Sequence, residues 1–320
     1  MSVNAHGLPR RIPESIRREI RVRSKFGCVV CRSAIVQYEH IDPEWHDAEA
    51  HDPDHMCLLC GGCHDKVTRG LLAKSTVRAR YDDVQAASKV RAPYDQFDLS
   101  SHAITVKLGS CVFQEAQTLI ELDGVVVLAI EPPEPGATFP MLTGFFTDPT
   151  GRLLLSIEKN EWTGGTEVWD LDVTGPTITV RLGKGQVALR LRVEPPSMIV
   201  VEKLDMRVGE GHLLLQGGQL AVGRVTPEAE YYVTLEGLQC LGAHIGVQVT
   251  STPIPTFRGL RIEGGKGVHL DGTGVRVGVG SPSAYILKLG IEHATKVNTR
   301  KLDVDFSVGQ VTPSEGPSRL

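Results

Sequence analysis

Two pairs of cysteines near the amino terminus constrain the fold of this chain more than any other feature. Cys28 and Cys31 form one C-x2-C pair, Cys60 and Cys63 form another, and 28 residues separate the two. Thiolates at positions i and i+3 of a tight turn point to one side, so two such turns can close a tetrahedral site that suits Zn2+. A structural zinc is therefore expected on Cys28, Cys31, Cys60 and Cys63.

Other roles for these cysteines fit the sequence less well. A redox C-x-x-C belongs on a thioredoxin-like βαβ pattern, which the sequence lacks. Disulfides require an oxidising compartment, whereas the amino terminus MSVNAHGLPRRIPESIRRE has no apolar signal region, so we expect a cytoplasmic protein. No apolar run approaches the roughly 20 residues that cross a bilayer, and no membrane association is expected. Cys57, in the apolar run MCLLC, is expected in the core.

Composition divides the chain into two parts. Five of seven Cys and six of eleven His lie in the first 64 residues, whereas 29 of 34 Gly lie after residue 80. Residues 1–80 hold 13 Lys and Arg against 10 Asp and Glu, a balance of +3, which leaves 21 against 28, or −7, for the remainder. At roughly 100–200 residues per domain, two domains are expected. We place them at residues 1–92 and 97–310, with a frayed tail at 311–320.

The larger domain is expected to be all-β. Short runs rich in Val, Leu and Ile recur at a spacing of roughly 8–12 residues, with Gly-containing turns between them. Residues 204–223 and 260–280 share a pattern of strand, Gly turn and strand, which is compatible with a sandwich-like domain or a β-solenoid. Trp162 and Trp169 are expected to pack in the core rather than to form a ligand platform. The domain holds no evident catalytic constellation, so we expect a role in regulation, oligomerisation or binding of a partner protein.

The first 91 residues are expected to form short elements. A helix follows Pro13 and ends before Gly27, a hairpin covers residues 28–41, and helices cover 65–74 and 76–91. Arginines at helical spacing share one face of the first helix, directly before the cysteines. A basic face can contact the phosphates of a nucleic acid, so phosphate contacts are expected from Arg17, Arg18 and Arg21, and also from Lys66 and Arg69 on the helix after the second cysteine pair.

Histidines and a glutamate accompany the cysteines. YEHIDP contains Glu39 and His40, and DPDHMCLLCGGCHDKVTRG contains His55 and His64. Over about residues 10–91 this arrangement resembles the HNH endonucleases of the ββα-metal family, in which a hairpin and a following helix carry the active site. The resemblance implies a small zinc-stapled ββα-metal domain; with the large all-β domain predicted from the strand pattern, we expect an α+β multidomain chain.

The resemblance also implies site residues and an activity. The implied activity is that of a metal-dependent endonuclease that hydrolyses DNA phosphodiester bonds. The implied site has His40 as general base and a divalent cation held by Glu39 and His64. His55 stands where the family has Asn, and Glu39 stands where Asp is commoner; His51 in the same loop is an alternative to His55. An imidazole suits proton abstraction from water, and the mixed ligands suit Mg2+, Mn2+ or Ni2+.

Two biological roles follow. Nucleases that resemble this one often act in restriction or anti-phage defence, which is an association through the resemblance alone. The alternative is a non-catalytic zinc-ribbon module that binds nucleic acid or protein, in which the histidines are structural and the β domain carries the function.

Overall fold

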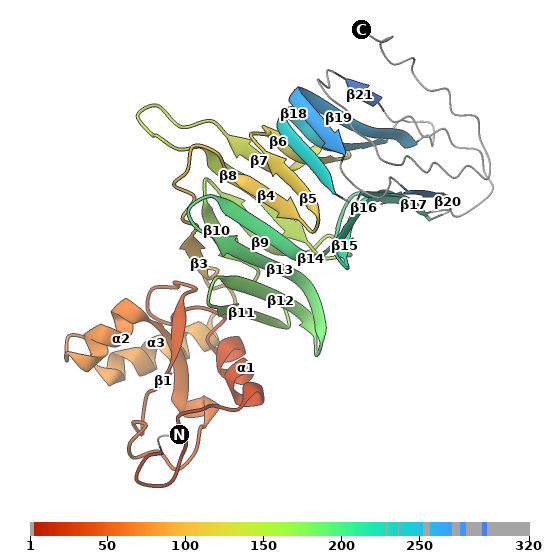
Figure 1. Ribbon diagram of the computed structural model, residues 1–320. Helices are drawn as coiled ribbons and strands as arrows, with labels where there is room; N and C mark the ends of the chain where they lie inside the picture. The colour runs from red at the N-terminus through yellow and green to blue at the C-terminus, as the bar shows by residue number, and fades with distance from the viewer. Residues whose placement is uncertain are drawn as a thin grey trace. The chain divides into compact units, whose positions relative to one another are not determined.

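The chain divides into two compact units. Residues 1–96 and 161–187 form unit 1, and residues 97–160 and 188–320 form unit 2. The computed structural model (Figure 1) describes residues 3–227, 230–235, 237–251, 257–270, 276–279 and 290–292. The predicted tail at 311–320 and part of the stretch 260–280 lie outside the described residues.

Unit 1 contains all the α-helices of the described chain and three pairs of strands. Its elements are α1 (Glu14–Arg23), β1 (Val36–His40), the 3-10 helix η1 (Pro53–His55), β2 (Met56–Cys60), α2 (Gly61–Thr68), α3 (Lys74–Ala86), β3 (Tyr94–Gln96), β10 (Glu161–Gly164), β11 (Asp170–Thr174) and β12 (Thr177–Gly183). No helix in the described ranges has both the length and the apolar character needed to cross a bilayer.

The boundary of unit 1 differs from the one expected from sequence. The last helix of this region, α3, ends at Ala86, and after Pro93 the chain continues directly into β3, which pairs antiparallel with β10. This pairing brings residues 161–187 into unit 1, where the indole of Trp162 is buried. The sequence does not reveal that residues 161–187 belong to unit 1, because the three-residue strand β3 that pairs with them carries almost no periodic signal.

The central hairpin of unit 1 joins β1 to β2. The two strands pair antiparallel, with Val36 opposite Cys60 and His40 opposite Met56. The predicted hairpin over residues 28–41 is therefore wrong, because β1 pairs with β2, which follows it after a long loop, and not with a strand that precedes it. The turn around the first cysteine pair takes up the residues expected to form the first strand.

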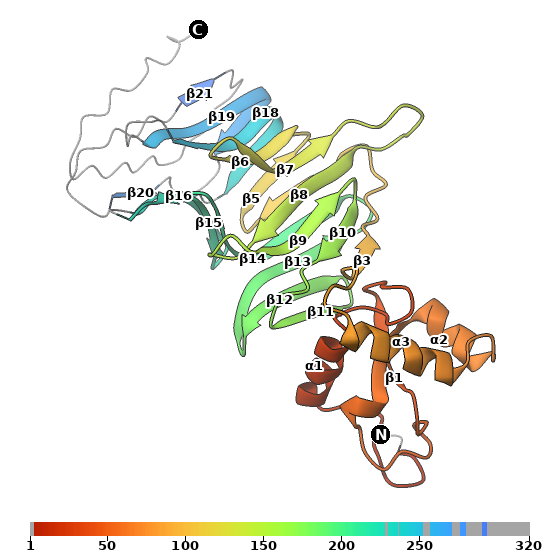
Figure 2. The same cartoon turned by 180° about the vertical axis from the view of Figure 1, so that it is seen from behind.

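Helices cover both faces of this hairpin. Successive side chains of a strand point to opposite faces. Met56 and Leu58 pack with Ile20 of α1, whereas Leu59 lies in the cluster that includes Tyr81 of α3. Figures 1 and 2 show α1 on one side of β1, with α2 and α3 on the other. Because both faces are covered, β2 is apolar along almost its whole length.

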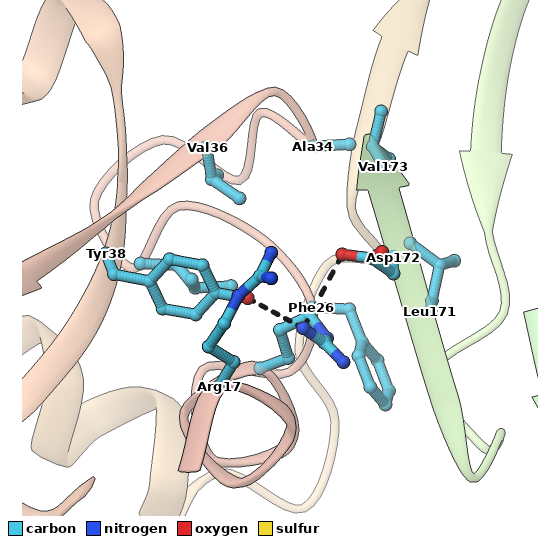
Figure 3. A pocket seen from close by; sticks show the side chains of 10 residues that line it. Arg17, Phe26, Ala34, Val36, Tyr38, Leu171, Asp172 and Val173 are labelled. Atoms are coloured by element: carbon cyan, nitrogen blue, oxygen red, sulfur yellow. Dashed lines mark hydrogen bonds and ion pairs between the residues drawn. The ribbon is translucent and has the colours of Figure 1, made fainter. Parts of the chain in front are cut away.

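A buried ion pair joins α1 to β11. Arg21 is 3% exposed, and its Nε and Nη2 donate to Asp170 Oδ1 and Oδ2 at 2.9 and 2.8 Å. Its Nη1 also donates to the Tyr38 hydroxyl at 2.7 Å and lies 3.5 Å from Asp172 Oδ1. Arg21, Tyr38 and Asp172 line a pocket between α1, β1 and β11 (Figure 3). A bidentate arginine–carboxylate pair fixes direction as well as distance, so it orients α1 on the hairpin of β11 and β12.

Unit 2 confirms the expected large β-rich region. Its strands are β4 (Thr105–Leu108), β5 (Cys111–Gln114), β6 (Thr118–Leu122), β7 (Val125–Glu131), β8 (Met141–Thr147), β9 (Leu153–Glu158), β13 (Gln186–Glu194, starting at the end of unit 1), β14 (Met198–Val208), β15 (Gly211–Gln216), β16 (Gln219–Val225), β17 (Glu230–Leu235), β18 (Leu238–Ser251), β19 (Phe257–Leu270), β20 (Arg276–Val279) and β21 (Gly290–Glu292).

Strand pairing in unit 2 mixes two patterns. Consecutive strands from β6 to β9 and from β13 to β17 pair antiparallel, as in meanders. Parallel pairs connect β14 to β4, and β18 to β5 and β6. Residues 204–223 belong to an antiparallel meander, whereas rungs of a parallel solenoid would pair in parallel.

Replacing Arg21 tests the buried ion pair. We expect Arg21→Met to lower the free energy of unfolding of unit 1 by about 3 kcal/mol, because Asp170 loses its main partner inside the protein. Arg181 still contacts Asp170 at 3.0 Å, which limits the loss. All three tryptophans of the chain lie in unit 1, so tryptophan fluorescence during denaturant unfolding reports on this unit.

Arg80→Met provides the matched control. Arg80 pairs with Asp83 on the surface of α3, where both side chains are more than half exposed. Removing that pair should change the stability by less than about 1 kcal/mol. Equal losses in the two variants would contradict the importance of the buried pair.

Candidate metal and catalytic site

Four cysteines converge in unit 1. The Sγ atoms of Cys28, Cys31, Cys60 and Cys63 all lie within 4.8 Å of one another, and those of Cys31 and Cys60 are 3.5 Å apart. Zinc–sulfur bonds of about 2.3 Å in a tetrahedron place sulfurs about 3.8 Å apart. The cluster therefore has the ligand type and the spacing to hold a metal such as zinc, as the sequence predicts.

Local structure positions each cysteine pair. Cys60 ends β2 and caps α2, with its Sγ accepting a hydrogen bond from the backbone N–H of Cys63. The first pair is held by Arg32, whose buried guanidinium donates to the carbonyls of Ser24 and Lys25 at 3.0 and 2.6 Å. Arg32 thus binds the turn into the first pair to the end of α1.

The pKa values of two cysteines of this cluster, Cys31 and Cys63, are raised, which opposes the loss of their protons. Burial, together with the charge of neighbouring cysteines, raises the pKa of Cys31 to about 11. The same causes raise the pKa of Cys63. A bound divalent cation would reverse both effects, because its charge stabilises thiolates.

A second group of side chains gathers beside the cysteine cluster. Glu39 of β1, which is largely buried, has its Oε2 at 3.0 Å from Nε2 of His64 on α2. Its Oε1 accepts a hydrogen bond from Lys74 Nζ at the start of α3. Lys74 also donates to the backbone carbonyl of His40. Glu39 and His64 are thus brought together as predicted, and Lys74 is an addition that the sequence did not indicate.

His40 makes its contacts elsewhere. Its imidazole Nε2 lies 3.2 Å from Nδ1 of His51, and His51 Nε2 lies 2.8 Å from the carbonyl oxygen of Pro9. Because strand side chains alternate, the His40 ring and the Glu39 carboxylate leave β1 on opposite faces. The predicted convergence of Glu39, His40 and His64 is therefore found only for Glu39 and His64.

These contacts fix the proton positions on both rings. The carbonyl of Pro9 can only accept, so Nε2 of a neutral His51 carries the proton and its Nδ1 is an acceptor. Nε2 of His40 must then donate to His51, which leaves Nδ1 of His40 unprotonated. Burial, followed by the charges of His51 and Lys74, lowers the pKa of His40 to about 4. His40 is consequently neutral at pH 7, with a free lone pair on Nδ1.

His55 supports the loop between the strands. It is half-exposed, its Nδ1 lies 2.6 Å from the carbonyl oxygen of Asp42, and its backbone carbonyl accepts from the N–H of Ile41. Of the two histidines considered for the family's Asn position, His55 contacts the loop backbone and His51 contacts the His40 ring. His55 therefore orients the loop backbone, and His51 orients the His40 ring.

The predicted DNA-contacting residues divide into two groups. Arg21 is buried in its pair with Asp170, and the Arg18 guanidinium stacks on Trp169, 3.6 Å from the ring centroid. Arg17 is partly exposed and pairs with Glu14. Arg21 is thus a structural residue, which corrects its expected role, because a guanidinium surrounded by protein acceptors is not presented to a phosphate. Lys66 is exposed on α2, the helix that carries His64, and Arg69 is exposed at the C-terminal cap of that helix.

Three residues of this region carry roles that the sequence did not reveal. Arg32 and Lys74 are ordinary basic residues in the sequence, and His51 is one of several histidines in an acidic loop. Their partners are mostly backbone carbonyls, which for Lys74 and His51 come from distant segments. A sequence pattern records side-chain types and spacing, so it gives no signal for such contacts.

Comparison of the chain with protein-family models, with curated proteins and with solved structures finds no match. The function of the protein is therefore inferred from its own residues and their geometry.

Replacing a cysteine tests the metal cluster. Cys28→Ser should remove bound zinc, because the buried thiolate is one of four ligands, and should make unit 1 unfold or aggregate. Inductively coupled plasma mass spectrometry of the purified full chain should find about one zinc per wild-type chain and none in the variant. Cys111→Ser, in unit 2, is the control and should retain the zinc. Zinc retained at full stoichiometry in Cys28→Ser would refute the four-cysteine site.

Proposed function

We propose that this protein is a metal-dependent endonuclease of the HNH type that hydrolyses DNA phosphodiester bonds in its unit 1. The observation that carries the proposal is the contact between Glu39 and His64 at the junction of a two-stranded hairpin and a helix, next to the four-cysteine cluster. Glu39 lies on β1, and His64 lies one residue beyond the last cysteine on α2. The resemblance noted in the sequence assigns these two residues the same task.

The spacing of Glu39 and His64 fits a divalent cation. Two ligand atoms at right angles on a cation with bonds of about 2.1 Å lie about 3.0 Å apart. Glu39 Oε2 and His64 Nε2 are separated by the same 3.0 Å. When bound there, the cation would supply positive charge to a phosphoryl oxygen and to the leaving oxygen. A carboxylate–imidazole pair suits Mg2+, Mn2+ or Ni2+.

His40 supplies the general base in this proposal. Its unprotonated Nδ1 would take a proton from the attacking water, the new phosphorus–oxygen bond would form, and the bond to the 3′ oxygen would break, with solvent protonating that oxygen. His51 keeps Nε2 of His40 engaged, so that only Nδ1 can accept a proton. The His40 ring is 8% exposed, so the proposal requires the DNA phosphate and its water to reach the ring at the end of β1.

Charge on the surface of unit 1 supports an anionic substrate. Lys66 is exposed on α2, and Arg69 is exposed at its C-terminal cap, where it pairs with Asp65 on the surface; both are near His64 in the sequence and could contact phosphates. With Arg21 inside the protein, this helix is favoured over α1 as the DNA-contacting element. A role for unit 2 in regulation or assembly, and a role of the protein in defence, stay predictions.

Replacing His40 tests the catalytic proposal. Purified protein incubated with supercoiled plasmid and Mg2+, Mn2+ or Ni2+ should nick or linearise it. His40→Ala should reduce the cleavage rate by about 10²–10⁴-fold, because loss of a general base removes assistance of that size. The measurement is the time course of supercoiled plasmid on agarose gels.

His46→Ala is the matched control. His46 lies in the loop that follows β1 and is 65% exposed, paired with Glu44 and Asp47 on the surface. Its replacement should leave the cleavage rate unchanged. A wild-type protein that is inert with every cation, on supercoiled, linear and single-stranded DNA, would favour the alternative of a non-catalytic zinc-binding module.

Replacing the cation ligands should change metal dependence. Glu39→Gln and His64→Ala should each raise the cation concentration needed for half-maximal cleavage by about ten-fold or more, since each removes one protein ligand. Zinc content should stay at the wild-type value, because the four cysteines are intact. Loss of zinc together with loss of cleavage would instead indicate that these residues only support the fold.

A further inference from the structure

Lys74 holds one half of the Glu39 carboxylate. Its Nζ donates to Glu39 Oε1 and to the backbone carbonyl of His40, while Glu39 Oε2 faces His64. The Glu39 side chain is 12% exposed and that of Lys74 is 27% exposed, so the ion pair is largely shielded from water. Each carboxylate oxygen thus has a different partner, and only Oε2 points to the candidate cation position.

We propose that Lys74 sets the cation preference of this site by holding Glu39 to coordination through a single oxygen. The inference rests on the proposed function of Glu39 and His64 as cation ligands. Mg2+ and Mn2+ accept a carboxylate through one oxygen in octahedral geometry, whereas Ca2+ often takes both oxygens of one carboxylate in a larger coordination shell. An ammonium fixed on Oε1 therefore selects against Ca2+.

The position of Lys74 makes this restraint rigid. Lys74 is the first residue of α3, and α3 is anchored to the hairpin through Val77 and Tyr81, both fully buried. The second contact of Nζ, to the His40 carbonyl, prevents the ammonium from following Glu39 if the carboxylate turns. Lys74 also places a positive charge beside the cation position, which weakens the binding of any divalent cation.

The two possible roles of Lys74 predict opposite changes in cation affinity when Lys74 is removed. If Lys74 only supported the fold, its removal would loosen Glu39 and weaken cation binding. If it restrains and competes with the cation, its removal should tighten binding and broaden the preference. Loss of one charge a few ångströms from a divalent cation raises affinity by about ten-fold even at the dielectric constant of water.

Cation binding to the full chain, with its zinc retained, tests the proposal. Mn2+ affinity is measured by electron paramagnetic resonance of free Mn2+, and Ca2+ affinity by its competition with Mn2+. Lys74→Met should bind Mn2+ about ten-fold more tightly, and its affinity for Ca2+ should rise by a larger factor. The ratio of Mn2+ to Ca2+ affinity should therefore fall. Glu39→Gln identifies the signal that belongs to this site.

Controls separate charge, fold and function. Lys74→Gln keeps a donor for the His40 carbonyl without the charge, and it carries the test if tryptophan fluorescence shows that Lys74→Met is unfolded. Lys89→Met removes an exposed charge beyond α3 and should leave both affinities unchanged. Unchanged or weaker Mn2+ binding in the Lys74 variants, or an unchanged Mn2+ to Ca2+ ratio, overturns the inference.

The outcome is separable from that of the proposed function. Plasmid cleavage by the wild type with unchanged cation affinities in the Lys74 variants would overturn only the inference. A Glu39-dependent cation site that shifts as expected in a protein without cleavage activity would overturn only the nuclease. Absence of any Glu39-dependent divalent binding would overturn the inference and the cation-binding step of the nuclease together.

Discussion

The four-cysteine cluster is the constraint on which the candidate site depends. One pair of cysteines precedes β1, and the other lies at the junction of β2 and α2. Closing the cluster fixes where α2 starts relative to the hairpin, and the first turn of α2 carries His64. The 3.0 Å contact between His64 and Glu39 therefore depends on four sulfurs that take no part in it. A metal at the cluster would act on the site through geometry alone.

The two faces of the central hairpin have different tasks. One face carries α1, whose arginines expected to contact DNA are directed largely into the protein, with Arg21 on Asp170 and Arg18 on Trp169. The other face carries α2 and α3, which present His64 and Lys74 to Glu39. A helix with a basic face can bind either a nucleic acid or acidic side chains of its own chain. Here buried Asp170 takes the most central arginine, because a buried carboxylate requires a paired charge.

The residues around Glu39 and His40 divide the work between two faces of one strand. Glu39 lies between the imidazole of His64 and the ammonium of Lys74, with one carboxylate oxygen facing each. His40 is held by His51, and through it by the carbonyl of Pro9, in a single tautomer. Burial favours the neutral form of that ring, as a proton acceptor requires. Hydrogen bonds to main-chain carbonyls at Pro9, His40 and Asp42 orient most of this arrangement.

The sequence by itself determined the four-cysteine cluster, the β-rich character of the larger part, and the candidate pairing of Glu39 with His64. The first two follow from residue type and short spacing, a C-x2-C turn and a repeated apolar run, whereas the third comes from the resemblance to the HNH endonucleases. Tertiary structure decided that residues 161–187 join the amino-terminal unit, that β1 pairs with β2, that Arg21 is internal, and that Lys74 and His51 complete the site. These outcomes depend on which distant segment buries which face, and on backbone carbonyls that no side-chain pattern records, so only the folded chain could supply them.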